Sequence, residues 1–111
     1  MAYDEALAAR IREQLKGRSG VTEQRMFGGL AFLINGNMAV AASGQGGVLV
    51  RADPDTGLRE LSSLGAEPMV MRGRPMDGWL RVDAGKVGTA KQLERCVNHG
   101  VGFASSLPTK R

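Results

Sequence analysis

Residues 25–42 read Arg-Met-Phe-Gly-Gly-Leu-Ala-Phe-Leu-Ile-Asn-Gly-Asn-Met-Ala-Val-Ala-Ala. Two short apolar runs, 30–34 and 38–42, flank the turn formed by residues 35–37. Asn-Gly is among the strongest local signals for a β-hairpin, because both central positions of the favoured turn need positive φ. Gly28 and Gly29, just before the first run, mark a kink, a bulge or a close approach of two backbones. The stretch contains no catalytic side chain and favours a binding or regulatory scaffold.

The first apolar run of this hairpin is apolar on both of its faces. Leu30, Phe32 and Ile34 point one way, and Ala31 and Leu33 point the other. An antiparallel strand with one solvated face alternates apolar with polar residues. We therefore expect a cover over the second face, supplied either by the same chain or by a second subunit. The second alternative makes the protein a homodimer.

Periodicity and turn signals divide the rest of the chain into helices and strands. Helices are predicted at 4–16, 53–65 and 89–107, and strands at 22–27, 30–34, 38–43, 48–52, 69–72 and 79–82, with a loop at 73–78. In the resulting order, α-β-β-β-β-α-β-β-α, helices and strands are segregated rather than strictly alternating. The sequence therefore predicts an α+β fold, a single domain over residues 1–111 (core about 3–108) with helices packed on an antiparallel sheet.

Capping signals mark the ends of the predicted helices. Asp4 is expected to cap the first helix, and Thr89 with Gln92 matches the capping box that begins the last one. Gly100 and Gly102 are expected to loosen the second half of that last helix.

The second helix is predicted from Asp53 followed by Pro54, an N-cap and a proline at the first helical position. Its apolar side is expected to contain three leucines, and Gly57 is expected to weaken its first turn. The three leucines are Leu58, Leu61 and Leu64.

Composition is that of an ordinary globular domain. The 111 residues are 42% hydrophobic and 23% charged, and the single cysteine, Cys96, excludes an internal disulfide framework. Charged residues interrupt the first 17 positions, so they do not form a signal peptide. No apolar run approaches the ~18 residues of a membrane span. These features predict a cytoplasmic protein without a membrane partner.

Positive charge is concentrated in the second half of the chain. Residues 1–55 contain six basic and six acidic side chains, whereas residues 56–111 contain nine basic and five acidic ones, which gives the net charge of +4. Such an asymmetry permits a polyanion as partner. The basic residues are scattered rather than clustered, so direct nucleic-acid binding is the alternative hypothesis and a solvated surface the simpler one.

Few residues suggest catalysis or metal binding. Cys96 and His99 lie three positions apart on the last predicted helix, so a small Cys/His enzyme is a third hypothesis, although core packing of the cysteine is favoured. A zinc site needs further ligands, and the chain has no other cysteine or histidine. The glycine-rich residues 44–47 lack the lysine and helix of a P-loop and predict a hairpin turn. We expect no metal, no cofactor and no enzyme activity.

One group of side chains forms a candidate surface for a protein partner or a nucleic acid. Arginine and tryptophan stack on bases, grip phosphates and are enriched at protein-binding hot spots. The alternative is that the tryptophan anchors a loop while the arginines are solvated. The candidate residues are Arg72, Arg74, Met76, Trp79 and Arg81.

Several separated motifs resemble one protein family along nearly the whole chain. They are residues 25–29, the hairpin ending in Met38, residues 67–69, Gly78-Trp79 and residues 104–108. Together they are similar to the N-terminal domain of the TfoX/Sxy competence-regulator family. Within these motifs the residues expected to be structural are Arg25, Met26, Phe27, Gly28, Gly29, Gly78, Ser105 and Pro108.

The resemblance implies a fold and a role. The family fold is a compact α+β domain with an antiparallel sheet and flanking helices. Family members promote the expression of competence genes and act with a transcription activator rather than as enzymes. We expect a stand-alone version of the domain, because the full regulators continue into a second, helical domain that this sequence does not contain.

Overall fold

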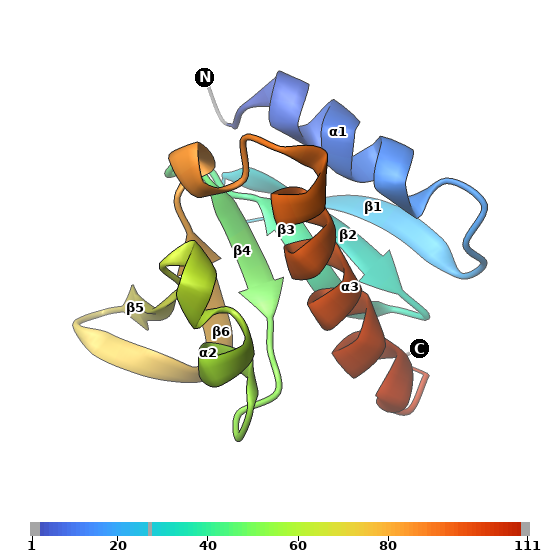
Figure 1. Cartoon of the computed structure of the whole chain (residues 1–111). Coiled ribbons are helices and arrows are strands. Elements are labelled where there is room, and N and C mark those ends of the chain that lie inside the picture. Colours follow the sequence, from blue (N-terminus) through green and yellow to red (C-terminus); the bar gives the residue numbers. More distant parts are fainter. Residues whose placement is uncertain (1–2, 27, 110–111) are drawn as a thin grey trace.

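The computed structural model describes residues 3–26 and 28–109 (Figure 1). Its helices are α1 (Glu5–Leu15), α2 (Gly57–Glu60) and α3 (Ala90–Ser106), with the short 3-10 turns η1 (Ser62–Leu64) and η2 (Ala84–Lys86). Its strands are β1 (Val21–Met26), β2 (Gly29–Ile34), β3 (Asn37–Ala42), β4 (Val48–Arg51), β5 (Glu67–Met71) and β6 (Arg74–Val82). The predicted order of helices and strands is confirmed.

The strands form a single six-stranded sheet in the order β1-β2-β3-β4-β6-β5. Every neighbouring pair is antiparallel, so the α+β fold with an antiparallel sheet is also confirmed. Figure 1 shows the three helices on the same side of this sheet. The main core lies between helices and sheet, where Phe32, Val40 and Val50 are completely buried.

The β2–β3 hairpin forms as the Asn-Gly signal predicts. Ile34 pairs with Asn37, and the two turn residues between them, Asn35 and Gly36, have φ of 52° and 85°. Positive φ at both positions matches the right-handed twist of the flanking strands. The turn fixes the pairing of Ile34 with Asn37 and of Leu33 with Met38. A register shift then pairs Phe32 with Val40, and both side chains belong to the core under the helices.

Both predicted caps are present in the structure. The Asp4 carboxylate accepts a hydrogen bond from the backbone N–H of Leu7 at 3.1 Å. At α3, the Gln92 N–H donates to the Thr89 hydroxyl, and the Thr89 N–H donates to the Gln92 side chain. These bonds satisfy N–H groups that the first turn of a helix leaves unpaired. The caps therefore fix where α1 and α3 begin.

The expectation that glycines loosen α3 is wrong. The helix is continuous to Ser106, and Gly100 is buried against β3. A Cβ at Gly100 would lie 2.3 Å from the carbonyl oxygen of Ala39. The glycine thus permits a close approach of helix and strand that no larger residue allows.

The second helix is shorter than predicted and begins later. The Asp53 carboxylate accepts from the N–H groups of Asp55 and Thr56 at 2.8 and 3.3 Å, which forms a turn before α2 instead of a helix cap. α2 begins at Gly57, where a Cβ would lie 2.6 Å from the Ala52 Cβ, so this glycine serves close packing. Leu58 is 48% exposed, contrary to prediction, whereas the other two leucines are buried.

The predicted loop at 73–78 is also wrong, because β6 already begins at Arg74. Met71 pairs with Arg74, and the two residues of the turn, Arg72 and Gly73, have φ of 54° and 79°. This is the same kind of tight turn as the one at Asn35-Gly36. An arginine in place of asparagine hides the hairpin signal in the sequence.

Candidate functional site

A second apolar cluster lies on the sheet face opposite the helices, which we call the open face. Its buried members are Ala31, Leu33, Met38, Ala41 and Leu49, and Met26, Met69 and Trp79 pack around them. All eight belong to strands, and in the described part of the chain no helix contributes to the cluster. The second apolar face inferred from β2 is therefore real.

The chain itself supplies most of the cover for this face. Ala31 has no exposed surface, and Leu33 is 8% exposed within the single chain. Long side chains from the outer strands, including Met26, Met69 and Trp79, pack against the small residues at the centre. The apolar second face thus does not by itself require a second subunit.

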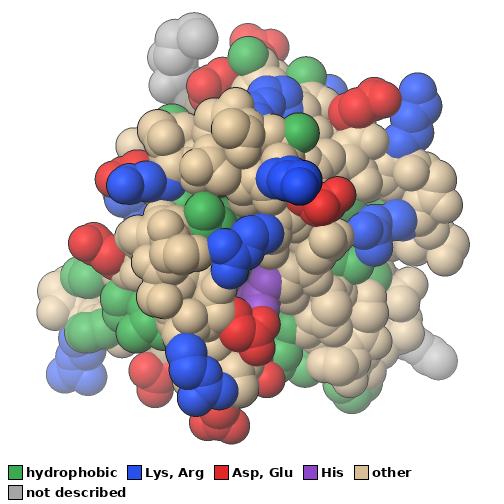
Figure 2. Space-filling view, in the orientation of Figure 1, with side chains coloured by type: hydrophobic (Ala, Val, Ile, Leu, Met, Phe, Trp, Pro, Cys, Tyr) green, Lys and Arg blue, Asp and Glu red, His purple; other side chains and the backbone are tan. Residues whose placement is uncertain are grey.

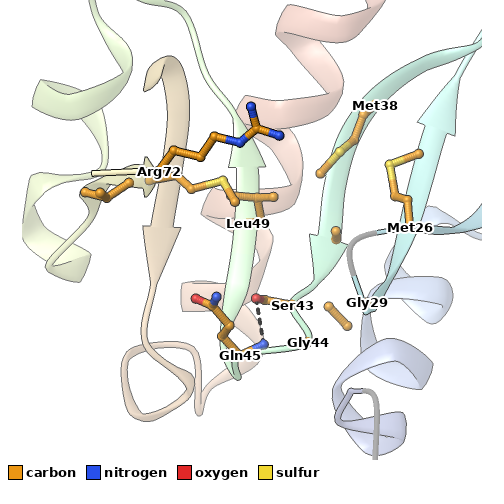
Figure 3. Close-up of a pocket in the computed structure, with 12 residues that line it drawn as sticks. Met26, Gly29, Met38, Ser43, Gly44, Gln45, Leu49 and Arg72 are labelled. Carbon is orange, nitrogen blue, oxygen red and sulfur yellow. Dashed lines mark hydrogen bonds between the residues drawn. The ribbon is translucent and has the colours of Figure 1, made fainter. Parts of the chain in front are cut away.

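The cover is incomplete and leaves a pocket of about 230 Å³ (Figure 3). Three methionines and Leu49 give it an apolar lining, and Ser43, Gln45 and Arg72 add polar groups. Figure 3 shows the Arg72 side chain extending from the β5–β6 turn across β4 toward Met38. Methionine is flexible and polarizable, so its side chains adapt to the shape of an incoming group. The full lining consists of Met26, Gly29, Met38, Ala41, Ala42, Ser43, Gly44, Gln45, Leu49, Met69, Val70 and Arg72.

Gly29 lines this pocket, and Gly28 precedes it in the chain. Gly28 has φ of 76°, in the turn between β1 and β2, and a Cβ at Gly29 would lie 2.4 Å from the carbonyl oxygen of Ala42. The predicted close approach of two backbones is therefore found at Gly29. Phe27, expected to be structural, lies outside the described residues.

Three of the predicted surface residues lie on or beside the open face. Arg72 lines the pocket, and Trp79 packs against the second cluster. The Arg51 guanidinium lies over the Trp79 ring at 4.8 Å from its centre, a cation–π contact. Arg81 is directly opposite Leu49 and donates to the Gly46 carbonyl at 2.7 Å. Trp79, Arg72 and Arg81 therefore lie beside the apolar centre, whereas the Arg51 guanidinium lies near both Trp79 and Phe103 of α3.

The other two predicted surface residues lie elsewhere. Met76 lines a separate hollow of about 90 Å³ together with Pro54 and Leu58. Arg74 is exposed at the start of β6. The structure therefore does not bring all five candidate residues together.

The remaining family-motif residues differ in their surroundings. Gly78 has φ of 82°, and its carbonyl accepts from the Ala52 N–H at 2.7 Å. The Pro108 carbonyl accepts from the Asn37 side chain at 2.9 Å, which ties the end of the chain to the β2–β3 turn. Ser105 is exposed on the last turn of α3, and Arg25 is exposed on β1.

The pocket residues from β1, β3 and β5 were not assigned to a site from the sequence. The usable signal was the double apolar face of β2, because it required something adjacent to Ala31 and Leu33 on the open face. Strand order decides which side chains those are, and a single sequence does not give it.

Cys96 and His99 do not form a catalytic pair. Cys96 is completely buried, and burial raises the pKa of its thiol to about 11, so the reactive thiolate is absent at neutral pH. His99 Nε2 accepts from the Asp53 N–H at 3.1 Å, and Nδ1 lies 3.1 Å from Glu60 Oε1. Both ring nitrogens therefore serve to hold the segment before α2 and α2 itself against α3.

Other chemistry-bearing groups are sparse. Among residues 3–26 and 28–109, no three His, Cys, Asp or Glu side chains converge as a metal site requires. The glycine-rich turn at 44–47 uses its N–H groups internally, since Gly46 donates to the Ser43 carbonyl and Gln45 donates to the Ser43 hydroxyl. It is a hairpin turn, as predicted. No helix in the described ranges is long and apolar enough to cross a bilayer.

Comparison with known proteins identifies the family. The family model described as the TfoX N-terminal domain matches residues 13–104, from within α1 almost to the end of α3. No curated protein and no solved structure matches the chain. The matched region includes the whole sheet and every residue that lines the methionine pocket. The chain therefore belongs to the TfoX N-terminal domain family.

Proposed function

We propose that this protein is a non-catalytic regulatory domain that binds a protein partner through the open face of its sheet. The resemblance to competence regulators supports a transcription activator as that partner and the cytoplasm as the place of action. The observation that carries the proposal is the methionine-lined pocket beneath Arg72, on a sheet face to which none of the helices in residues 3–26 and 28–109 contributes.

The physical character of the open face suits a protein rather than a cofactor. The pocket volume of about 230 Å³ lies below the range of about 300–1,000 Å³ that is typical of small-molecule sites. An apolar centre with a polar rim is the usual anatomy of a protein interface, and tryptophan and arginine are its commonest hot-spot residues. We expect one apolar side chain of the partner to enter the pocket and an acidic group to meet Arg72 or Arg51.

The proposal can be tested by comparing two charge-introducing variants. The double variant Met69→Glu/Arg72→Glu alters the rim of the pocket, where both side chains are accessible. Leu58→Glu introduces one negative charge at a 48% exposed position on α2, away from the open face, and serves as control. Affinity capture from the source cells, followed by calorimetry with the purified partner, is expected to show at least a tenfold loss for the double variant only. Equal capture by both variants would refute the proposal.

A second candidate function is direct binding of DNA or RNA. Arg72 and Arg74 are both exposed at the β5–β6 hairpin, which favours a phosphate contact there. On the helix side, basic and acidic side chains are interspersed (Figure 2), so that side offers no extended positive surface. Binding by this route would weaken steeply with salt and depend on both arginines. A low-salt gel shift that shows no complex would reject it.

A further inference from the structure

The two edges of the sheet differ in their capacity to accept another strand. β5 contains Pro68, which lacks an N–H group, and its pairing with β6 is interrupted by a register shift. Proline and irregular pairing both protect an edge from further strand addition. β1 has six residues without proline, pairs regularly with β2 and has exposed side chains from Thr22 to Arg25. The β1 edge is therefore the one suited to strand addition.

The register of β1 shows which of its backbone groups point outward. The Asn35 N–H donates to the Gly20 carbonyl at 2.9 Å, and the regular pairing continues to Met26 and Gly29. Because inward and outward groups alternate along an antiparallel strand, the even-numbered residues bond to β2. Residues 21, 23 and 25 consequently direct their N–H and C=O groups away from the sheet.

We infer that a second copy of this chain adds to the β1 edge, with β1 antiparallel to its counterpart and Glu23 opposite the partner's Arg25. Only odd-numbered residues can exchange hydrogen bonds across this edge. A register with Glu23 opposite itself, or Arg25 opposite itself, places like charges together, which is destabilising. The register proposed here instead gives two Glu–Arg pairs and four backbone hydrogen bonds about a two-fold axis at Gln24.

The surroundings of Glu23 support this pairing. Arg12 of α1 donates to both Glu23 oxygens at 2.6 and 2.9 Å and lowers the pKa of the carboxyl. The Glu23 side chain nevertheless remains 37% exposed, so it is accessible to a second arginine. Glu23 and Arg25 lie on the same face of β1. The partner's Arg25 would therefore join Arg12 around one carboxylate.

Complementary charge variants test the pairing. Arg25→Glu places Glu opposite Glu, and Glu23→Arg places Arg opposite Arg, so each homodimer is expected to weaken about tenfold or more. A mixture of the two variants restores opposite charges at both positions and is expected to form a heterodimer. Light scattering and sedimentation measure each association between 10 and 500 µM. This is roughly the range of dissociation constants that we expect for a contact of four hydrogen bonds and two ion pairs.

A third variant separates pairing from folding. Arg25→Pro removes only an outward N–H group, which an edge strand tolerates, and is expected to abolish the dimer while thermal unfolding stays cooperative. A wild-type chain that remains monomeric at 500 µM would overturn the inference, as would a dimer that survives Arg25→Pro. Met69→Glu/Arg72→Glu should leave dimerisation intact, so failure here is distinct from failure of the open-face proposal.

Discussion

The two faces of the sheet differ in how closely their side chains pack. On the helix side, Phe32, Val40 and Val50 have no exposed surface, and Gly100 lets α3 approach β3 closely. On the open face, the described strand side chains pack against one another and leave a pocket of about 230 Å³. Close packing of β-branched and aromatic residues stabilises a single arrangement of their side chains, whereas methionine side chains can adopt several conformations. Stability is therefore concentrated on the helix side, and adaptability on the open face.

The largest expected effect comes from removing the central aromatic side chain of the helix side. Phe32→Ala should destabilise the fold by about 3–5 kcal/mol, because it deletes a fully buried ring and leaves a cavity. Met69→Ala on the open face should cost about 1 kcal/mol or less, because this side chain is only partly buried. Urea unfolding followed by circular dichroism measures both. Similar losses for the two variants would contradict the division between the faces.

A pair of glycine substitutions in α3 should change stability in opposite directions. Gly100→Ala is expected to cost about 1–3 kcal/mol, because its Cβ would lie 2.3 Å from the Ala39 carbonyl oxygen. Gly102→Ala is the control, since nothing lies within 4 Å of its Cβ, and it should stabilise the helix by about 0.5–1 kcal/mol. Thermal unfolding compares the two. A stabilising Gly100→Ala would show that α3 does not approach β3 as closely as described.

The sequence predicted local structure where one residue type carries the signal. Asn35-Gly36 gave the β2–β3 hairpin, whereas Arg72-Gly73 forms a turn of the same kind that an arginine conceals. The Asp53-Pro54 signal was genuine, but the carboxylate caps a turn instead of a helix. In each case the local residue types are compatible with more than one backbone conformation, and the folded structure contains one of them.

The pocket was harder to predict because it depends on strand order. Met26, Met38 and Met69 come from β1, β3 and β5, which are far apart in the sequence, and they line one pocket in the folded sheet. Alternation on β2 indicated that its second face needed a cover but not which residues supplied it. Long-range pairing of this kind leaves no periodic signal in a single sequence.

A smaller effect is expected from a substitution in the β5–β6 turn, which should stabilise the fold but weaken partner binding. Arg72 has φ of 54°, a conformation that costs a residue with a side chain about 1 kcal/mol and glycine little. Arg72→Gly should therefore raise the free energy of unfolding by about 1 kcal/mol or somewhat less and weaken partner binding at the open face. Asn35→Gly, in the equivalent turn, is the control and should change neither by much. If Arg72→Gly lowered the free energy of unfolding, the positive φ of Arg72 would not be a source of strain.

The last effect is confined to alkaline pH and comes from the Cys96 thiol, on the helix side. Its folded-state pKa of about 11 exceeds the ordinary value of 9.0, so below pH 9 the thiol is protonated in both the folded and the unfolded chain. Its ionisation should leave stability unchanged up to about pH 9 and lower it as the pH rises from about 9 to about 11. Alkylation by iodoacetamide at pH 8 should be much slower in the folded protein than in urea. Equal rates would mean that the helix-side core opens readily. The helix side would then not be the more rigidly packed face of the sheet.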